Sequence, residues 1–233
     1  MKQFGVLVAL GLFLISSVSA QVKINPAETC PGPEGFILNR IVCRSNVDWK
    51  ESNILGVLMN SFADTEVPGG VSIALKDGDA RKEFAPDSFT LQGVLDHVIT
   101  VSPGYQWSES GGVVNVFPLE DYEVLNLTVP EFEFENKTKH ELLAEVIQTK
   151  QFRQYLKKYS VSAPRLLYMG GLQDPRPPRK FSISLKNATV RDILNEIVRL
   201  NGSSTWVYME YESSWPENVP QKRYKLYFLV SNY

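Results

Sequence analysis

The stretch that most constrains the fold begins at Phe181 and reads FSISLKNATVRDILNEIVRLNGSSTWVYMEYE. Its first residues alternate between apolar and polar, which is typical of a strand with one buried face. Thr189 can then accept a hydrogen bond from the free N–H groups of a helix start, and Asp192 favours the positive helix end. Apolar residues recur with the helical period up to Asn201-Gly202, which predicts the helix end. Because 206–211 reads as a returning strand, the stretch predicts a strand–helix–strand unit.

The helical part of this pattern occurs three times. The runs TLQGVLDHVI from Thr90, TKHELLAEVI from Thr138 and TVRDILNEIV from Thr189 share a threonine, three residues, an apolar residue, a leucine, two residues and two apolar residues. Spacings of about fifty residues are typical of a repeated supersecondary unit. Amphipathic helices in general share much of this pattern, so a chance match is the alternative. After the first run, Ser110-Gly111-Gly112 predicts a β-hairpin turn between two strands.

The predicted fold class is α+β, with tandem small βαββ-type units whose helices pack on short mixed or antiparallel sheets. The predicted divisions are a signal peptide at 1–20, an N-terminal arm at 21–46, a first α+β unit at 47–120, a divergent middle unit at 121–172, a linker rich in Pro and Arg at 173–180 and a C-terminal unit at 181–233.

The first residues predict export. Lys2 precedes an apolar run at 6–15, and Val18-Ser19-Ala20 offers small residues for cleavage after Ala20. The apolar run is too short for a comfortable transmembrane helix, and no later segment approaches the length needed to span a membrane. We therefore expect a periplasmic or secreted protein that carries no transmembrane segment after cleavage.

Export gives meaning to the two cysteines. Cys30 and Cys43 are the only pair, and an oxidising compartment favours a disulfide between them. Closing so short a loop is worth on the order of 3 kcal/mol in the chain-entropy model. Two free thiols are the alternative.

The order strand, Asn-x-Thr, helix, Gly, strand resembles the short N-terminal domain shared by secretins and TonB-dependent transducers. The residues that carry the resemblance are Ile183, Leu185, Lys186-Asn187-Ala188-Thr189, Ile193-Leu194 and Gly202, and the stretch from Thr90 to Phe117 is similar from its helix onward. The resemblance implies small βαβ units in the periplasm that recognise another envelope protein. No long run of amphipathic barrel strands follows, so a secretin pore or a receptor barrel is not expected.

The sequence offers no pattern of a catalytic or metal site. His140 and Glu141 lack the second histidine of a metallopeptidase helix, and His97 beside its apolar stripe is interpreted as structural. Ser110 lies in the predicted hairpin rather than in a nucleophile elbow. A net charge of −2 gives no argument for nucleic acid. We expect no enzyme, no cofactor and no metal.

Two surfaces are candidates for binding. Aromatic residues gather near the C-terminus, and an exposed row of them would recognise a partner, with core packing as the alternative: Trp206, Tyr208, Tyr211, Tyr224 and Tyr227. One local basic excess would suit an anionic surface such as phospholipid or an acidic protein face, with a solvated helix face as the alternative: Lys150, Arg153, Lys157 and Lys158.

The sequence therefore predicts an exported, non-catalytic module that binds another cell-envelope protein, by strand addition at a sheet edge or through the aromatic face. The alternatives are a secreted hydrolase with an active site that the sequence does not reveal, and a structural envelope protein that assembles with itself.

Overall fold

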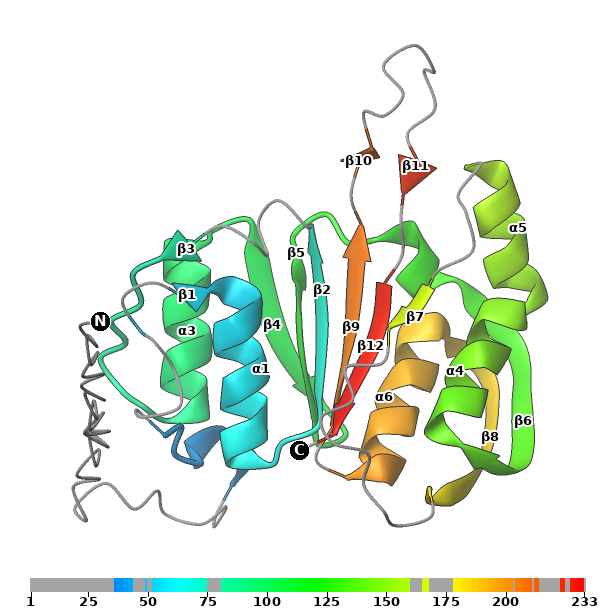
Figure 1. The fold of residues 1–233 in the computed structure, drawn as a ribbon, viewed down its shortest axis with the longest axis horizontal. Helices are drawn as coiled ribbons and strands as arrows, with labels where there is room; N and C mark the ends of the chain where they lie inside the picture. Colours follow the sequence, from blue (N-terminus) through cyan, green and yellow to red (C-terminus); the bar gives the residue numbers. More distant parts are fainter. Residues whose placement is uncertain are drawn as a thin grey trace, which may run out of the picture.

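A computed structural model of the chain describes residues 36–43, 49, 52–74, 81–159, 165–167, 178–202, 204–210, 212–213, 223–224 and 227–232. Its centre is one six-stranded mixed sheet in the order β4-β5-β2-β9-β12-β7, covered by helices (Figure 1). This arrangement confirms the predicted α+β class. Within the described residues, no helix has the length and apolar character needed to cross a membrane.

The first half of the chain folds into a unit with the element order β-α-β-β-α-β-β. Its elements are β1 (Ser52–Asn53), α1 (Ile54–Thr65), β2 (Gly69–Ala74), β3 (Arg81–Lys82), α3 (Leu91–Val101), β4 (Tyr105–Ser110) and β5 (Val113–Pro118). β1 pairs with β3 antiparallel, β2 with β5 parallel, and β4 with β5 antiparallel. The last pair is the hairpin that the sequence predicted, and Gly111 and Gly112 adopt the positive φ that its turn requires.

The second half repeats this order and this pairing. Its main elements are β6 (Thr128–Thr138), α4 (Lys139–Gln148), β7 (Arg165–Leu167), β8 (Lys180–Thr189), α6 (Val190–Asn201), β9 (Ser204–Glu210) and β12 (Tyr227–Asn232). β6 pairs with β8 antiparallel, β7 with β12 parallel, and β9 with β12 antiparallel. Each of these pairs has its counterpart in the first half, so the chain is a tandem repeat of two units.

The division predicted between a middle unit at 121–172 and a C-terminal unit at 181–233 is therefore wrong. Strands from both segments pair with one another in β6–β8 and in β7–β12. The two segments are halves of one unit, and the boundary between repeats lies in the connection from β5 to β6. Most of the predicted linker at 173–180 lies outside the described residues.

The second unit carries two segments that the first unit lacks. α5 (Lys150–Lys158) stands between α4 and β7, whereas only three residues separate α1 from β2. The short pair β10 (Glu212–Ser213) and β11 (Arg223–Tyr224) lies between β9 and β12, where the first unit has a two-residue turn. In Figure 1 both segments lie at the upper end of the sheet.

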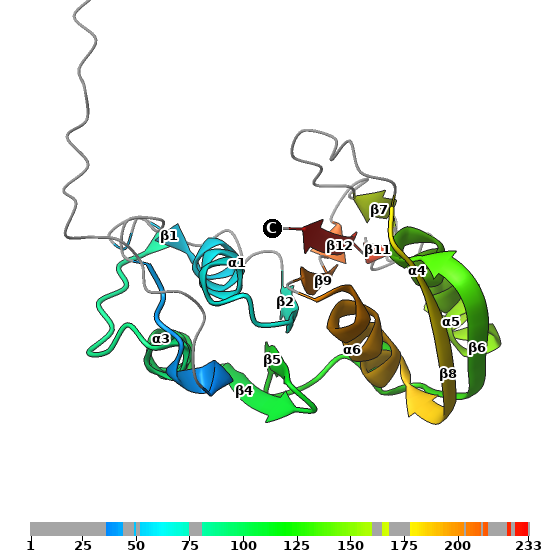
Figure 2. The same cartoon turned by 90° about the horizontal axis from the view of Figure 1, so that it is seen from below.

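One strand contact fuses the two units into a single sheet. β2 pairs in parallel with β9 over six residues, from Gly69 opposite Thr205 to Ala74 opposite Glu210. The second unit repeats the strand order of the first, but each of its strands runs opposite to its counterpart in the first unit. The two units therefore place their helices on opposite faces of the sheet. Figure 2 shows α1 and α3 on one side of the sheet and α4 and α6 on the other.

The core is correspondingly double. One apolar cluster joins α1 and α3 to residues such as Val71, Val116 and Val207, and the other joins α4 and α6 to residues such as Trp206 and Tyr208. Neighbouring residues of β9 thus point into different clusters, as expected of a strand that is covered on both faces. The outer strand β4 differs, because Gln106, Ser108 and Ser110 on its side away from α3 lie exposed or half-buried.

Each helix of the repeats begins at a capping residue that the sequence marks. The Thr90, Thr138 and Thr189 side chains accept from the N–H three residues on, and the last two form full capping boxes. The three predicted helices are thereby confirmed, and their shared apolar positions are buried except for Ile99, which is half-buried. Asn53 caps α1 in the same way, with its Oδ1 2.6 Å from the Gly56 N–H nitrogen. α1 does not match the shared pattern, because its cap is Asn rather than Thr and Ser61 stands where the other three helices have an apolar residue.

Candidate functional site

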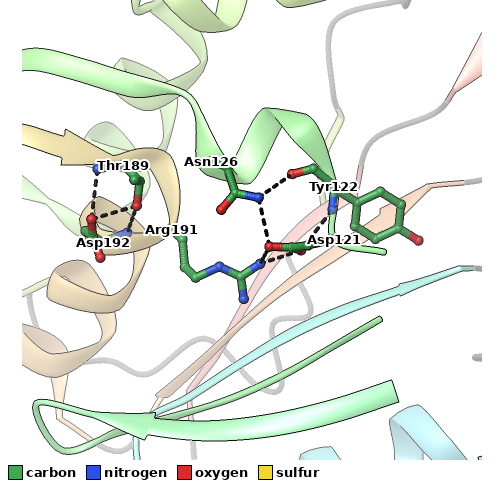
Figure 3. A network of polar contacts seen from close by, with 6 residues as sticks. All are labelled: Asp121, Tyr122, Asn126, Thr189, Arg191 and Asp192. Atoms are coloured by element: carbon green, nitrogen blue, oxygen red, sulfur yellow. Dashed lines mark hydrogen bonds and ion pairs between the residues drawn. The ribbon is translucent and has the colours of Figure 1, made fainter. Parts of the chain in front are cut away.

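A polar network lies where the two units meet (Figure 3). Arg191 on the first turn of α6 donates from Nη2 to both carboxylate oxygens of Asp121, each at 2.6 Å. Asp121 belongs to the connection between β5 and β6, and its oxygens also accept from the Tyr122 N–H and the Asn126 side-chain amide, both at 2.9 Å. On the next residue of α6, Asp192 closes the capping box with Thr189. The network therefore fixes the inter-unit connection against α6.

Aromatic rings enclose the same guanidinium. Its Cζ lies 4.6 Å from the centre of the Phe117 ring on β5 and 5.9 Å from that of Trp206 on β9. The Arg191 and Asp121 side chains are only 13% and 20% exposed. Burial lowers the pKa of Arg191, while the Asp121 carboxylate opposes this shift. A charge pair so enclosed is placed to hold the units together rather than to receive a ligand.

The aromatic row predicted as a binding surface is not exposed at its first two members. Trp206 and Tyr208 are 0% exposed, so assigning them to a partner surface is wrong. The Trp206 Nε1–H donates to Asn195 Oδ1 at 2.8 Å, which satisfies its polar atom inside the core. Tyr211 lies outside the described residues. Tyr224 and Tyr227 lie in β11 and β12, of which only the backbone is described.

The predicted basic patch lies on α5. Phe152 and Tyr155 are buried, while Lys150, Arg153 and Lys157 are exposed on the opposite side of the helix. Within the described part of the chain, Lys150 and Lys157 form no ion pair. The structure therefore brings these three cations together on one exposed stripe, which we call the α5 stripe.

Lys158 is a member of the predicted patch with a different role. Its Nζ lies 2.9 Å from Glu123 Oε1, and the Tyr159 hydroxyl donates to the other carboxylate oxygen. Hydrogen bonds from Tyr159 and then Lys158 lower the pKa of Glu123. Lys158 thus ties α5 to the short helix η4 (Glu123–Asn126) and is partly neutralised by it.

The predicted disulfide lies at the edge of the described structure. Cys43 is buried, and its N–H donates to the Asp64 carboxylate at 2.9 Å. Cys30 lies outside the described residues, so the Cys30–Cys43 bond stays a prediction.

The histidines and acidic residues considered as catalysts have structural surroundings. His97 Nε2 accepts from the Ala85 N–H at 2.9 Å, which agrees with its interpretation as structural. Burial, and then the neighbouring Lys139, lower the pKa of His140. Glu141 closes the capping box of α4. Among the described residues, no three His, Cys, Asp or Glu side chains gather as they would around a metal ion.

No sequence signal marks the Arg191–Asp121 pair, because the partners are separated by 70 residues. Comparisons of the chain with known protein families, with curated proteins and with solved structures found no match.

Proposed function

We propose that this chain is an exported, non-catalytic binding module of the cell envelope, which recognises another envelope protein much as the N-terminal domains of secretins and TonB-dependent transducers do. The observation that carries the proposal is the tandem repeat of β-α-β-β-α-β-β units, fused through β2 and β9 into one sheet. The resemblance of Phe181 to Tyr211 to those domains supports it, because this stretch forms the β8-α6-β9 part of the second unit.

The fused sheet is suited to a binding role. β2 and β9 lie inside the sheet with helices on both faces, and the Arg191–Asp121 pair fixes the connection between the units. A rigid scaffold of this kind holds its exposed edges and inserted segments in place without an ordering cost on binding. Export rests on the signal sequence at 1–20, and a periplasmic location is part of the proposal.

A pull-down from solubilised envelope of the source cell tests this function. The bait is the mature chain from Gln21 to Tyr233, because β6–β8, β7–β12 and β2–β9 pairings leave no single segment complete. The control is an exported protein of unrelated fold and similar net charge. Reproducible enrichment of one envelope component, with direct binding of the purified pair, is the expected result. The proposal is overturned if no component exceeds the control, and turnover of a substrate in a hydrolase screen would then support the alternative of a secreted hydrolase.

A further inference from the structure

The segments by which one repeat exceeds the other point to a binding surface. The two units agree in every main element, yet the second alone carries α5 and the β10–β11 pair. In repeat proteins, segments inserted into one unit often form the binding face. Both segments project at the same end of the sheet (Figure 1).

The chemistry of α5 indicates what this end would bind. Helical geometry places residues 150, 153 and 157 within one narrow sector, and about 10 Å of helix separates the first from the last. The aromatic residues Phe152 and Tyr155 face the core and hold the helix in place. Lys150 and Arg153 are exposed together with Lys157, in a chain whose net charge is −2. The stripe is therefore a local positive surface on a net acidic protein.

We propose that the α5 stripe, at the end of the sheet where the β10–β11 pair also lies, docks an acidic segment of the partner protein. This inference rests on the proposed function, since it names the chemistry of the partner and the end of the sheet where it binds. Three cations on a fixed helix attract a complementary row of carboxylates over the same length and set its register. A protein segment suits the stripe better than a lipid surface, because no exposed apolar residue of α5 accompanies the charges for insertion into a membrane.

The stripe is tested by charge reversal with a matched control. The test variant is Lys150→Glu/Arg153→Glu/Lys157→Glu, and the control is Lys180→Glu/Lys186→Glu, which reverses exposed cations on β8 outside the proposed surface. Amide chemical shifts of the isotope-labelled mature chain are recorded during titration with a polyglutamate peptide. They are also recorded with vesicles of equal parts phosphatidylglycerol and phosphatidylcholine. Circular dichroism of both variants confirms that they remain folded.

The expected result is that the peptide shifts amides of α5 and of β10–β11. Affinity should fall about tenfold or more in the test variant and stay within about twofold in the control. The inference is overturned if the peptide does not bind, if both variants weaken binding alike, or if vesicles engage the stripe while the peptide does not.

The pull-down described above separates this inference from the function on which it rests. If the wild-type chain and the test variant capture the same envelope component equally, the binding function stands and the stripe is not its site. If the wild-type chain captures nothing while the peptide still binds through α5, the proposed function fails and the acidic preference of the stripe remains.

Discussion

At Gly70 in β2 the backbone of the first unit lies directly against Trp206 of the second. A Cβ atom added there would lie 2.3 Å from Trp206 Cε2, 2.4 Å from Trp206 Cζ2 and 2.5 Å from Asn115 Oδ1. Trp206 is fully buried and is held by its hydrogen bond to Asn195. The ring therefore cannot withdraw without disturbing α6 or β9, and Gly70→Ala tests how tightly the units are joined.

The expected cost follows from two opposing effects. Overpacking a well-filled core costs typically 1–3 kcal/mol, and three contacts below 3.0 Å place this site at the upper end, about 3 kcal/mol. Alanine in a strand gains about 0.5–1 kcal/mol over glycine. We expect Gly70→Ala to lower the free energy of unfolding by about 2–2.5 kcal/mol. Gly104→Ala is the control, because a Cβ there meets nothing within 4 Å, and its effect should stay within about 0.5 kcal/mol.

Equilibrium urea unfolding, followed by tryptophan fluorescence and by far-UV circular dichroism, measures both variants. A double-mutant cycle with Trp206→Phe isolates the contact, because the smaller ring leaves room for the added methyl group. In that background Gly70→Ala should cost less by about 1.5 kcal/mol or more. The reasoning fails if Gly70→Ala costs under about 1 kcal/mol, or if its cost is unchanged beside Trp206→Phe.

Three further changes test other contacts. Asp121→Ala leaves the Arg191 guanidinium buried without its carboxylate, and urea unfolding should show a loss of about 3 kcal/mol in the free energy of unfolding. The loss should be smaller in the double variant with Arg191→Met, and an equal loss in the single and double variants would contradict a buried pair. Burial lowers the pKa of Lys139 from 10.5 to about 8, so with rising pH the folded chain loses the Lys139 proton before the unfolded chain does. The free energy of unfolding of the native chain, relative to that of Lys139→Met, should therefore rise by up to about 3 kcal/mol between pH 8 and pH 10.5. Lys186 is exposed, so Lys186→Met should show no such pH-dependent difference from the native chain. The burial argument is refuted if the difference in the free energy of unfolding between the native chain and Lys139→Met does not change with pH. Thr189→Ala removes the cap of α6 and should cost about 1 kcal/mol by thermal unfolding, whereas Thr189→Ser should cost little; equal costs would argue against capping.

The features that the sequence predicted correctly are local ones. Thr90, Thr138 and Thr189 act within one helical turn, and their spacing from the apolar residues is visible in the sequence. The hairpin at Gly111-Gly112 is equally local. The amphipathic character of α5 is also local, because its nine residues show an aromatic and a basic side in the sequence; the structure places three of the four predicted cations in the α5 stripe.

Features that depend on distant strands were missed. Alternation along β9 shows that Trp206 and Tyr208 share a face, but it does not show what covers that face. Because β2 and β12 flank this strand and helices lie on both sides of the sheet, both of its faces are interior. The apolar run around Val207 is the one local sign of a strand that is covered on both faces. The pairing of β6 with β8, which unites the middle and C-terminal segments, has no counterpart in local spacing.

The polar side of β4 has a consequence for the size of the sheet. β4 and β7 are the outer strands of the sheet, and they correspond to β9 of the second unit and β2 of the first. Because β4 and β7 run in the same direction, β7 of one molecule could pair with β4 of the next in the way that β2 pairs with β9. Where β9 presents Thr205, Val207 and Met209 to the preceding unit, β4 presents three polar side chains to water. Covering those side chains without partners is unfavourable, which opposes growth of the sheet from one molecule to the next. The kind of strand contact that joins the two units within the chain is therefore disfavoured between chains at the β4 edge.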